Sequence, residues 1–307
     1  MTTLKERHQR IALGRLCLLF GVTRQSYYQH YWFWEEKTFE QELVVKQVMQ
    51  IRKRHPCIGT RKLYQLLEPF MLDHQIKMGR DALFDLLAAN SLLVRRRKNR
   101  MRTTNSFHWL RKYPNLIKEF APLSVNQLWV SDITYWKTSI GYLYISFITD
   151  AYSHKIVGFR VDKTLEAAAS VKALKMAIRE ATGSLNGLIH HSDRGLQYCS
   201  GEYVKVLKRH KVKISMTENG DPKQNAVAER INGIIKGEYL ENYQVNSLKQ
   251  ARKLLRQTIR LYNSERPHMS INNRIPSEIH QSKNIEVLRK WKNYYPNNKP
   301  TVNQYQD

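Results

Sequence analysis

The stretch Gln127–Thr138, QLWVSDITYWKT, decides the fold class because apolar residues occupy positions on both of its alternating faces. Successive side chains of a strand point to opposite faces, so this pattern predicts a strand that is buried on both sides. Asp132 interrupts the apolar run in its middle. A carboxylate in such a position costs free energy unless it is paired, and Asp132 is therefore a candidate functional residue.

The residues that follow predict a sheet layered with helices. Gly141 marks a turn, and the runs YLYISFITDAYS and KIVGFRVDK complete a meander of three strands. A helix (TLEAAASVKALKMAIREAT), a fourth strand (LNGLIHHSDRG), a helix (GEYVKVLKRHK) and a fifth strand (VKISMT) come next. This order predicts an α/β fold with a five-stranded mixed sheet flanked by helices. The basic run SLKQARKLLRQTIRLYNSERPH predicts a long helix near the end.

Residues 217–238, TENGDPKQNAVAERINGIIKGE, predict a loop and then one helix after the fifth strand. Apolar residues at helical spacing predict the packed side of this helix: Val227, Ile231 and Ile234. A polar strip is predicted along another side, and it contains Asn225, Glu229, Asn232 and Lys236. Solvated strips of this kind are common, so the strip alone does not identify a site.

Upstream of the sheet, the sequence predicts small helical modules. Residues 8–31 read as a helix, a turn at Gly21 and a second helix capped by Thr23, and a further helical stretch runs to about Arg54. This outline fits a DNA-binding helix-turn-helix or a plain helical hairpin. The patterns HPCIGTRKLYQLL and GRDALFDLLAANSLLV predict a second helical DNA-binding module.

We therefore divide the chain into four ranges. Residues 1–54 form the helix-turn-helix-like module, residues 55–120 the second module with a basic linker, residues 121–280 the core with the sheet, and residues 281–307 a tail. The linker, RRRKNRMR, has no apolar period and is predicted to follow phosphates. Its candidate DNA contacts are Arg95, Arg96, Arg97, Lys98 and Arg100.

Charge identifies the class of partner. The 307 residues include 51 lysines and arginines against 26 acidic residues, a formal net charge of +25 at pH 7. The excess is spread along the chain, which suits a nucleic-acid backbone that runs over several domains. No stretch resembles an interfacial helix, a signal peptide or a membrane span, so a membrane partner is disfavoured. Cys17, Cys57 and Cys199 form no zinc-type CxxC pair or disulfide framework, which favours a reducing cytoplasm.

Two more carboxylates stand where the sheet would bring them near Asp132. Asp193 ends the fourth strand, and Glu229 lies on the helix after the fifth strand, with 35 residues between them. Strand ends of open α/β sheets commonly present functional groups. Clustered carboxylates repel one another, and hard divalent cations such as Mg²⁺ or Mn²⁺ relieve that repulsion. Two such ions would support displacement at a phosphodiester.

The motifs WVSDITY, HHSDRGLQY and QNAVAERINGIIK resemble, in order and spacing, the DDE integrase core shared by retroviral integrases and many transposases. Lys236, seven residues after Glu229, and YNSERPH at residues 262–268 resemble more narrowly the OrfB transposases of the IS-three family of bacterial insertion sequences. The resemblance runs from about residue 10 to residue 280. Gln224 stands where this family often has Asp, and ERINGIIK lacks an aromatic pair seen in many members. Retroviral integrases also carry a His/Cys zinc module, and this sequence contains no such pattern, so the retroviral branch is disfavoured.

The resemblance implies an RNase H-like catalytic core that cuts and joins DNA at the ends of a mobile element. It implies that Asp132, Asp193 and Glu229 hold two Mg²⁺ ions, for which Mn²⁺ can substitute. Lys236 is implied to lie near the terminal DNA, and Arg266 is a further candidate DNA contact. The implied partners are double-stranded terminal inverted repeats, target DNA and further copies of the chain on paired ends. The resemblance also points to fusion with, or dependence on, an upstream-frame protein, in a bacterial cytoplasm at the nucleoid.

Two other classes of protein stay open from the residues alone. A tyrosine recombinase would need an Arg/His set around one of the 17 tyrosines and no essential metal. A non-catalytic helix-turn-helix regulator would leave the three carboxylates without a role. Histidine-type single-strand transposases are excluded, because they need a His-hydrophobe-His pair and none of the 11 histidines has another two positions away.

Overall fold

The computed structural model describes residues 11–94, 108–181, 185–218 and 222–282. The chain divides into two compact units, one of residues 1–53 and 66–93 and the other of residues 54–65 and 94–307. Residues 54–65 thus group with the unit that contains the sheet, and the four ranges expected from the sequence stay a prediction. The predicted linker contacts lie outside the described residues: Arg95, Arg96, Arg97, Lys98 and Arg100.

The first unit is helical. α2 (Leu13–Leu19) leads into a turn at Gly21, whose φ of 65° is a left-handed conformation that glycine adopts without strain. Thr23 caps the next helix, because its Oγ1 accepts a hydrogen bond from the Ser26 N–H at 3.0 Å. The next helices among the described residues are α3 (Arg24–Arg54), α4 (Thr60–Asp73) and α5 (Arg80–Ala89), of which residues 54 and 60–65 group with the second unit. Their buried apolar residues within this unit include Val44, Val48, Leu67, Met71, Leu83 and Leu87.

α3 is one continuous helix of 31 residues, whereas the sequence suggested a short helix and a separate helical stretch. It contains no glycine or proline, the two residues that most often interrupt helices. Aromatic rings one turn apart also support it, since Tyr27 stacks with Tyr31 and Tyr28 with Trp32. The predicted turn and cap are confirmed, and DNA docking by these helices stays a prediction.

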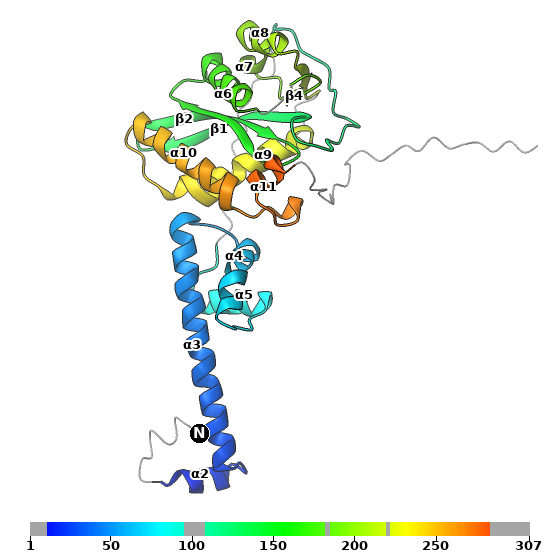
Figure 1. Ribbon diagram of the computed structural model, residues 1–307. Coiled ribbons are helices and arrows are strands. Elements are labelled where there is room, and N and C mark those ends of the chain that lie inside the picture. Colours follow the sequence, from blue (N-terminus) through cyan, green and yellow to red (C-terminus); the bar gives the residue numbers. More distant parts are fainter. Residues whose placement is uncertain (1–10, 95–107, 182–184, 219–221, 283–307) are drawn as a thin grey trace, which may run out of the picture. The chain divides into compact units, whose positions relative to one another are not determined.

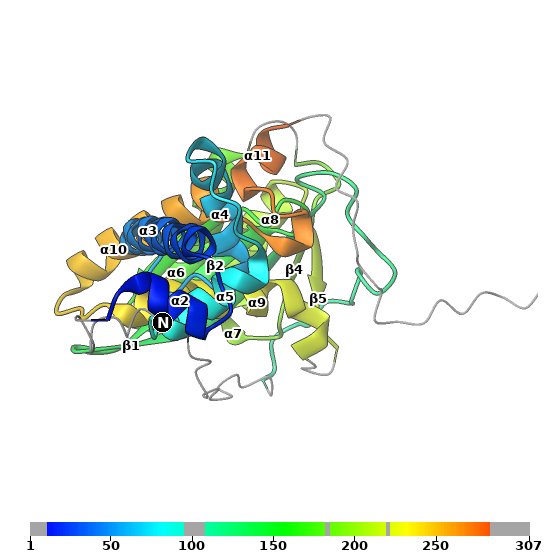
Figure 2. The ribbon, with the colours of Figure 1, turned by 90° about the horizontal axis from the view of Figure 1, so that it is seen from below.

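The second unit is built on the five-stranded mixed sheet that the sequence predicted (Figure 1). The strand order is β3-β2-β1-β4-β5, with β1, β2 and β3 as an antiparallel meander and with β4 and β5 parallel to β1. Figure 2 shows β4 and β5 side by side. The strands are β1 (Leu128–Thr138), β2 (Gly141–Asp150), β3 (Ile156–Asp162), β4 (Ile189–Ser192) and β5 (Lys213–Met216).

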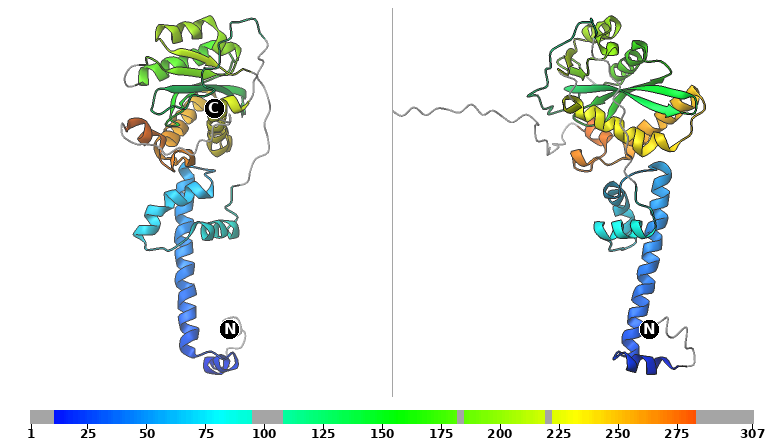
Figure 3. Two further views of the ribbon diagram at one scale, coloured as in Figure 1. Left: turned by 90° about the vertical axis from the view of Figure 1, so that its right-hand side faces the viewer. Right: turned by 180° about the vertical axis from the view of Figure 1, so that it is seen from behind.

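Helices cover both faces of this sheet (Figures 1 and 3). One apolar core joins the sheet to α6 (Ala167–Glu180), α7 (Leu196–Cys199) and α8 (Gly201–Arg209). A second core, on the other face, joins it to α9 (Ala226–Ile234) and α10 (Leu248–Glu265). Among the described residues, the last helix is α11 (Pro276–Gln281). Within the described parts of the chain, no helix is long and apolar enough to cross a bilayer.

The edge strand β3 is held closely from both sides. A Cβ on Gly158 would lie 2.3 Å from the carbonyl oxygen of Ala173 on α6, so only glycine permits this approach of helix to strand. From the other face, Asn263 of α10 donates through Nδ2 to the Ile156 carbonyl and accepts from the Ile156 N–H, both at 3.0 Å. These contacts fix β3 between α6 and α10.

Candidate active site

Asp132 lies on β1, the central strand, and is half-buried. Asn232 of α9 donates a hydrogen bond through Nδ2 to Asp132 Oδ2 at 2.6 Å. Burial raises the pKa of Asp132 to about 8, and the negative charges of Asp193 and Glu229 contribute to the increase. In the chain alone, this carboxyl group is therefore mostly protonated at neutral pH, and a nearby cation would favour its charged form.

Asp193 follows β4, the strand that pairs in parallel with β1. Its Oδ1 accepts a hydrogen bond from the Gly195 N–H at 3.0 Å. Burial raises the pKa of Asp193, while the Gly195 N–H and the charge of His108 act in the opposite direction. His108 is itself anchored through Nε2 to the Arg194 carbonyl oxygen at 2.6 Å. His108 was not a sequence candidate, because it lies in a segment without a periodic pattern.

Glu229 lies in the first turn of α9 and is exposed. Two buried asparagines hold this helix on β1, since Asn225 donates to the Ser131 carbonyl at 2.9 Å and Asn232 donates to Asp132. Half of the predicted polar strip therefore faces the sheet rather than solvent. Helical periodicity marks these residues as polar but does not show that a strand supplies their hydrogen-bond partners. The docking of α9 brings the charge of Glu229 close enough to act on Asp132.

The charges of Asp193 and Glu229 act on Asp132, but the three side chains do not converge to form a closed metal site. Among the described residues, no group of three His, Cys, Asp or Glu side chains is arranged to hold a metal ion. The donor chemistry nevertheless fits a hard divalent cation, because each group offers carboxylate oxygens. A cation would also relieve the repulsion that raises the pKa of Asp132. The arrangement is thus one that a divalent ion would complete.

Lys236 lies in η2 (Ile235–Tyr239), a π-helical turn that follows α9, and is half-buried. The sequence suggested a single helix with Glu229 and Lys236 on one face. The α-helical part ends at Ile234 and the π-helical turn begins at Ile235, one residue before Lys236, so the segment is not one regular α-helix. Such turns inside helices occur frequently at functional sites.

The expectation that Arg266 contacts DNA needs correction, because its side chain is fully buried. Arg266 follows α10 and forms a two-point ion pair with Glu238, with Nε to Oε2 and Nη2 to Oε1 both at 2.7 Å. Burial alone would raise the pKa of Glu238, but Arg266 and Lys62 together bring it below its ordinary value. The guanidinium group joins the end of α10 to η2 and is not available to DNA.

A buried polar layer supports β4. His190 Nε2 lies 2.7 Å from Ser131 Oγ and 2.9 Å from the Tyr203 hydroxyl, and His191 Nδ1 lies 2.8 Å from Ser215 Oγ. Burial lowers the pKa of His190 to about 3 and that of His191 to about 4, so both rings are neutral at pH 7. The histidine pair before Asp193 therefore links β1, β4, β5 and α8 within the core.

Comparison with known proteins identifies the family of the sheet-containing part of the chain. Two family profiles, both described as Integrase core domain, match residues 122–222 and residues 210–276. The first range includes Asp132 and Asp193, and the second includes Glu229 and Lys236. The matched ranges together cover the whole sheet and helices α6 to α10.

Similar proteins include the uncharacterized 31 kDa protein of insertion element IS600 from Shigella sonnei, 34% identical over 270 residues, 87% of this chain and 97% of that protein. The transposase for insertion sequence element IS629 from Shigella sonnei is 29% identical over 78% of this chain and 81% of its own length. Among solved structures, the HTLV-2 integrase catalytic core domain in complex with magnesium has a TM-score of 0.41 at 20% identity, covering 52% of this chain and 99% of that chain. The chain belongs to the IS-three family of bacterial insertion-sequence transposases, whose catalytic part is an integrase core.

Proposed function

We propose that this transposase cuts DNA at the ends of its insertion sequence and joins them to target DNA, with Asp132, Asp193 and Glu229 as the catalytic residues. The observation that carries the proposal is that the charges of Asp193 and Glu229 both act on Asp132. A carboxylate with a purely structural role is normally surrounded by donors. A carboxyl group whose pKa is raised by two neighbouring carboxylates is typical of a site for a cationic ligand.

The three carboxylates would hold the divalent metal, for which we propose two Mg²⁺ ions, with Mn²⁺ as a substitute. Bound there, the ions would supply charge neutralisation at the phosphate and a lower pKa for the attacking oxygen. Asp132 must lose its proton to act as a ligand, so metal affinity and pH are linked.

The chain's own residues fix the carboxylates in place. The Asn232 amide orients the Asp132 carboxyl group, and the Gly195 N–H orients that of Asp193. Asn232 lies on α9 and Gly195 directly precedes α7, and both helices contribute buried residues to the apolar cores of the unit. Lys236, near the start of η2, supplies a positive charge for a DNA phosphate.

The proposed reaction has two steps and needs no covalent bond to the protein. First, a water oxygen attacks the phosphorus at the element's end, and the bond to the 3′ oxygen breaks, which releases a 3′ hydroxyl. Second, this hydroxyl attacks a phosphorus of the target, forms a new phosphodiester and releases a 3′ hydroxyl of the target strand. Each step exchanges one P–O bond for another, so no oxidant or energy source is required.

The proposed partners are the double-stranded terminal inverted repeats and the target DNA, in the bacterial cytoplasm at the nucleoid. The net charge of +25 supports a polyanionic partner. α2 and the start of α3 are proposed to contact the end sequence, and the basic linker to follow phosphates. Because paired ends are processed together, we propose a homo-oligomer, with an upstream-frame protein as a fused or separate component.

A nicking assay tests the proposed function. The full chain is incubated with a duplex that carries the inverted repeat found beside its gene, in Mg²⁺, in Mn²⁺ and in EDTA. We expect a nick with a 3′ hydroxyl that requires either metal. Cutting in EDTA with DNA attached to a tyrosine would support a tyrosine recombinase instead. Binding to the end without cutting in either metal would support a DNA-binding regulator.

A further inference from the structure

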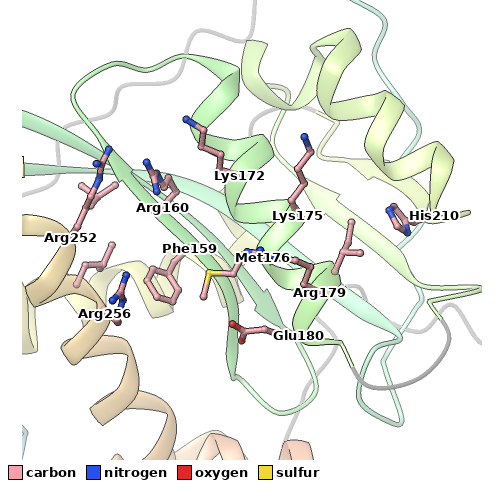
Figure 4. A pocket seen from close by; sticks show the side chains of 13 residues that line it. Phe159, Arg160, Lys172, Lys175, Met176, Arg179, Glu180, His210, Arg252 and Arg256 are labelled. Carbon is pink, nitrogen blue, oxygen red and sulfur yellow. The ribbon is translucent and has the colours of Figure 1, made fainter. Parts of the chain in front are cut away.

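A basic pocket of about 670 Å³ lies along the free edge of β3, between α6 and α10. Figure 4 shows its side chains, which come from both helices, from the strand between them and, for His210, from the end of α8. Glu180 is the one acidic residue among those that line it in the described parts of the chain. The cations that line it are Arg160, Lys172, Lys175, Arg179, Arg252 and Arg256.

Most of this positive charge is not neutralised within the protein. Arg160 and Arg252 share a single carboxylate, that of Asp162, at 3.6 and 3.3 Å. The Nε atoms of both arginines are buried and have no hydrogen-bond partner among the described residues. The other four cations of the pocket are exposed and form no ion pair with any part of the chain that the structure describes. The pocket therefore holds a surplus of cations that an anionic ligand would satisfy.

The cations lie in two rows on either side of the strand. On α6, Lys172, Lys175 and Arg179 recur at intervals of three and four residues, so they share one side of the helix and span about 10 Å. On α10, Arg252 and Arg256 are one turn apart, about 6 Å along the axis. One DNA strand advances about 3.4 Å for each phosphate, so the α6 row matches a run of about three phosphates.

The pocket is separate from the catalytic carboxylates. Asp132 pairs with Phe147 on β2, and Phe147 pairs with Phe159, which lines the pocket. Two strand spacings place the backbone of Phe159 about 10 Å from that of Asp132, with the buried ring of Phe147 between them. A phosphate in the pocket is therefore not the phosphate that reacts.

We propose that this pocket is a second DNA site, which holds the phosphodiester backbone of DNA away from the reacting phosphate. This proposal depends on the proposed function in one respect, namely that DNA is the substrate. A second copy of the chain is a poorer occupant, because a two-fold contact would set the same six cations against each other. The DNA held there is either the flank continuous with the element's end or a separate target duplex.

Removal of the α6 row tests this site. The triple variant Lys172→Ala, Lys175→Ala and Arg179→Ala keeps helix-forming residues on an exposed face. The matched control replaces three exposed cations of α8 in the same unit, Lys205, Lys208 and Arg209, by alanine. Affinity is measured by fluorescence anisotropy across a salt series for three duplexes: an end of about 25 base pairs, the same end with a flank to about 60 base pairs, and an unrelated duplex of about 60 base pairs.

We expect the pocket variant to lose about tenfold in affinity for a long duplex at about 0.1 M salt, and its salt slope to fall by about 2 to 3. The α8 control should change both quantities much less. Loss confined to the flanked end identifies flanking DNA as the ligand, and loss on both long duplexes identifies target DNA. Equal effects of the two triple variants would overturn the proposal, as would a changed oligomeric state with unchanged DNA affinity.

Two further measurements keep the result interpretable. A variant with Lys172→Arg and Lys175→Arg keeps the charge and should bind long DNA as the wild type does, whereas weakened binding would contradict a phosphate site. Nicking of the short end by the wild type is measured in the same samples. If the wild type fails to nick while the pocket variant still loses affinity, the proposed function fails and the DNA site stands. If the wild type nicks the short end and the pocket variant keeps its affinity for long DNA, the second DNA site is rejected and the proposed function stands.

Discussion

Asp132 and Asp150 are carboxylates on adjacent strands, and their surroundings show what distinguishes a reactive group from a structural one. Asp150 is fully buried, yet it accepts hydrogen bonds from the Asn126 N–H at 2.8 Å and from the N–H and hydroxyl of Ser153 at 2.7 and 2.8 Å. Those hydrogen bonds satisfy its oxygens and fix the end of β2. Asp132 instead has two other carboxylates within electrostatic range, which help to raise its pKa, and a nearby cation would favour its charged form.

The raised pKa of Asp132 predicts how stability changes with pH in metal-free protein. Between the unfolded pKa, near 3.9, and the folded value of about 8, the folded state binds more protons, so rising pH lowers stability through this group. Asp132→Asn removes that penalty. We expect the variant to gain about 2 kcal/mol over the wild type at about pH 9 and almost nothing at about pH 4.

Urea unfolding in EDTA at several pH values measures this difference. The variant Asp85→Asn, which changes an exposed aspartate on α5, is the control and should show no such trend. A difference between Asp132→Asn and the wild type that stays constant across the pH range would contradict the assigned environment of Asp132.

At the scale of single residues, the sequence predicts those side chains whose chemistry conflicts with their neighbours. Asp132 is visible because it interrupts an apolar run. The role of Asn232 is not visible, because its partner lies 100 residues away in sequence. The partner of Arg266 is hidden in the same way, because only the folded chain brings Glu238 to it, and the sequence alone therefore suggests a DNA contact. Long-range pairing of this kind leaves no local pattern in the sequence.

At the scale of elements, the periodicity of apolar residues after β5 predicts which side of the helix is packed but not where the α-helix ends. The packed residues Ile231 and Ile234 are buried as the pattern predicts, and partly buried Val227 packs against the same core. The helix nevertheless changes from α9 to the π-helical η2 at Ile235. Side chains further along, above all the half-buried Glu238 and the buried Tyr239, have partners outside the helix.

The ion pair between the end of α10 and η2 is predicted to be structural. Arg266→Met leaves Glu238 buried without its main partner, and we expect it to cost about 3 to 5 kcal/mol in the free energy of unfolding. The double variant Arg266→Met with Glu238→Gln removes the buried charge and should recover most of that loss. Both values come from urea unfolding. If the folded double variant bound DNA much more weakly than the wild type, Arg266 would be a DNA contact after all.

The close approach of α6 to β3 is predicted to depend on Gly158. Its alanine variant would place Cβ against the Ala173 carbonyl oxygen and 2.9 Å from Ala177 Cβ, and neither neighbour can move without shifting the helix. We expect Gly158→Ala to cost about 3 kcal/mol. Gly233→Ala is the control, because α9 leaves open space there and the added methyl group should be neutral or stabilising. Equal stability of the two variants would show that α6 does not pack as described.

At the scale of the molecule, the sheet was predictable because each strand and helix carries its own local pattern. All five strands occur in the predicted order along the chain, and β3 lies at an edge of the sheet. The compact units were not predictable, since residues 54–65 join the sheet through distant partners. The Cys57 N–H donates to the Glu238 carbonyl at 3.1 Å, and His55 Nδ1 lies 2.8 Å from the Tyr239 hydroxyl. Local sequence around residue 55 indicates only a turn and a helix.

Isosteric replacement of Asp132, Asp193 and Glu229 shows directly whether these three carboxylates together cut DNA. Asp132→Asn, Asp193→Asn and Glu229→Gln are compared with the control Glu218→Gln, which changes a carboxylate paired with Lys118. Single-turnover nicking of an element end in Mg²⁺ and affinity for that end are measured on the same samples. We predict that each of the three variants loses at least about 1,000-fold in nicking rate and keeps its affinity for the end within about threefold, while the control nicks normally. An Asp193→Asn protein that still nicks at the wild-type rate would contradict the account.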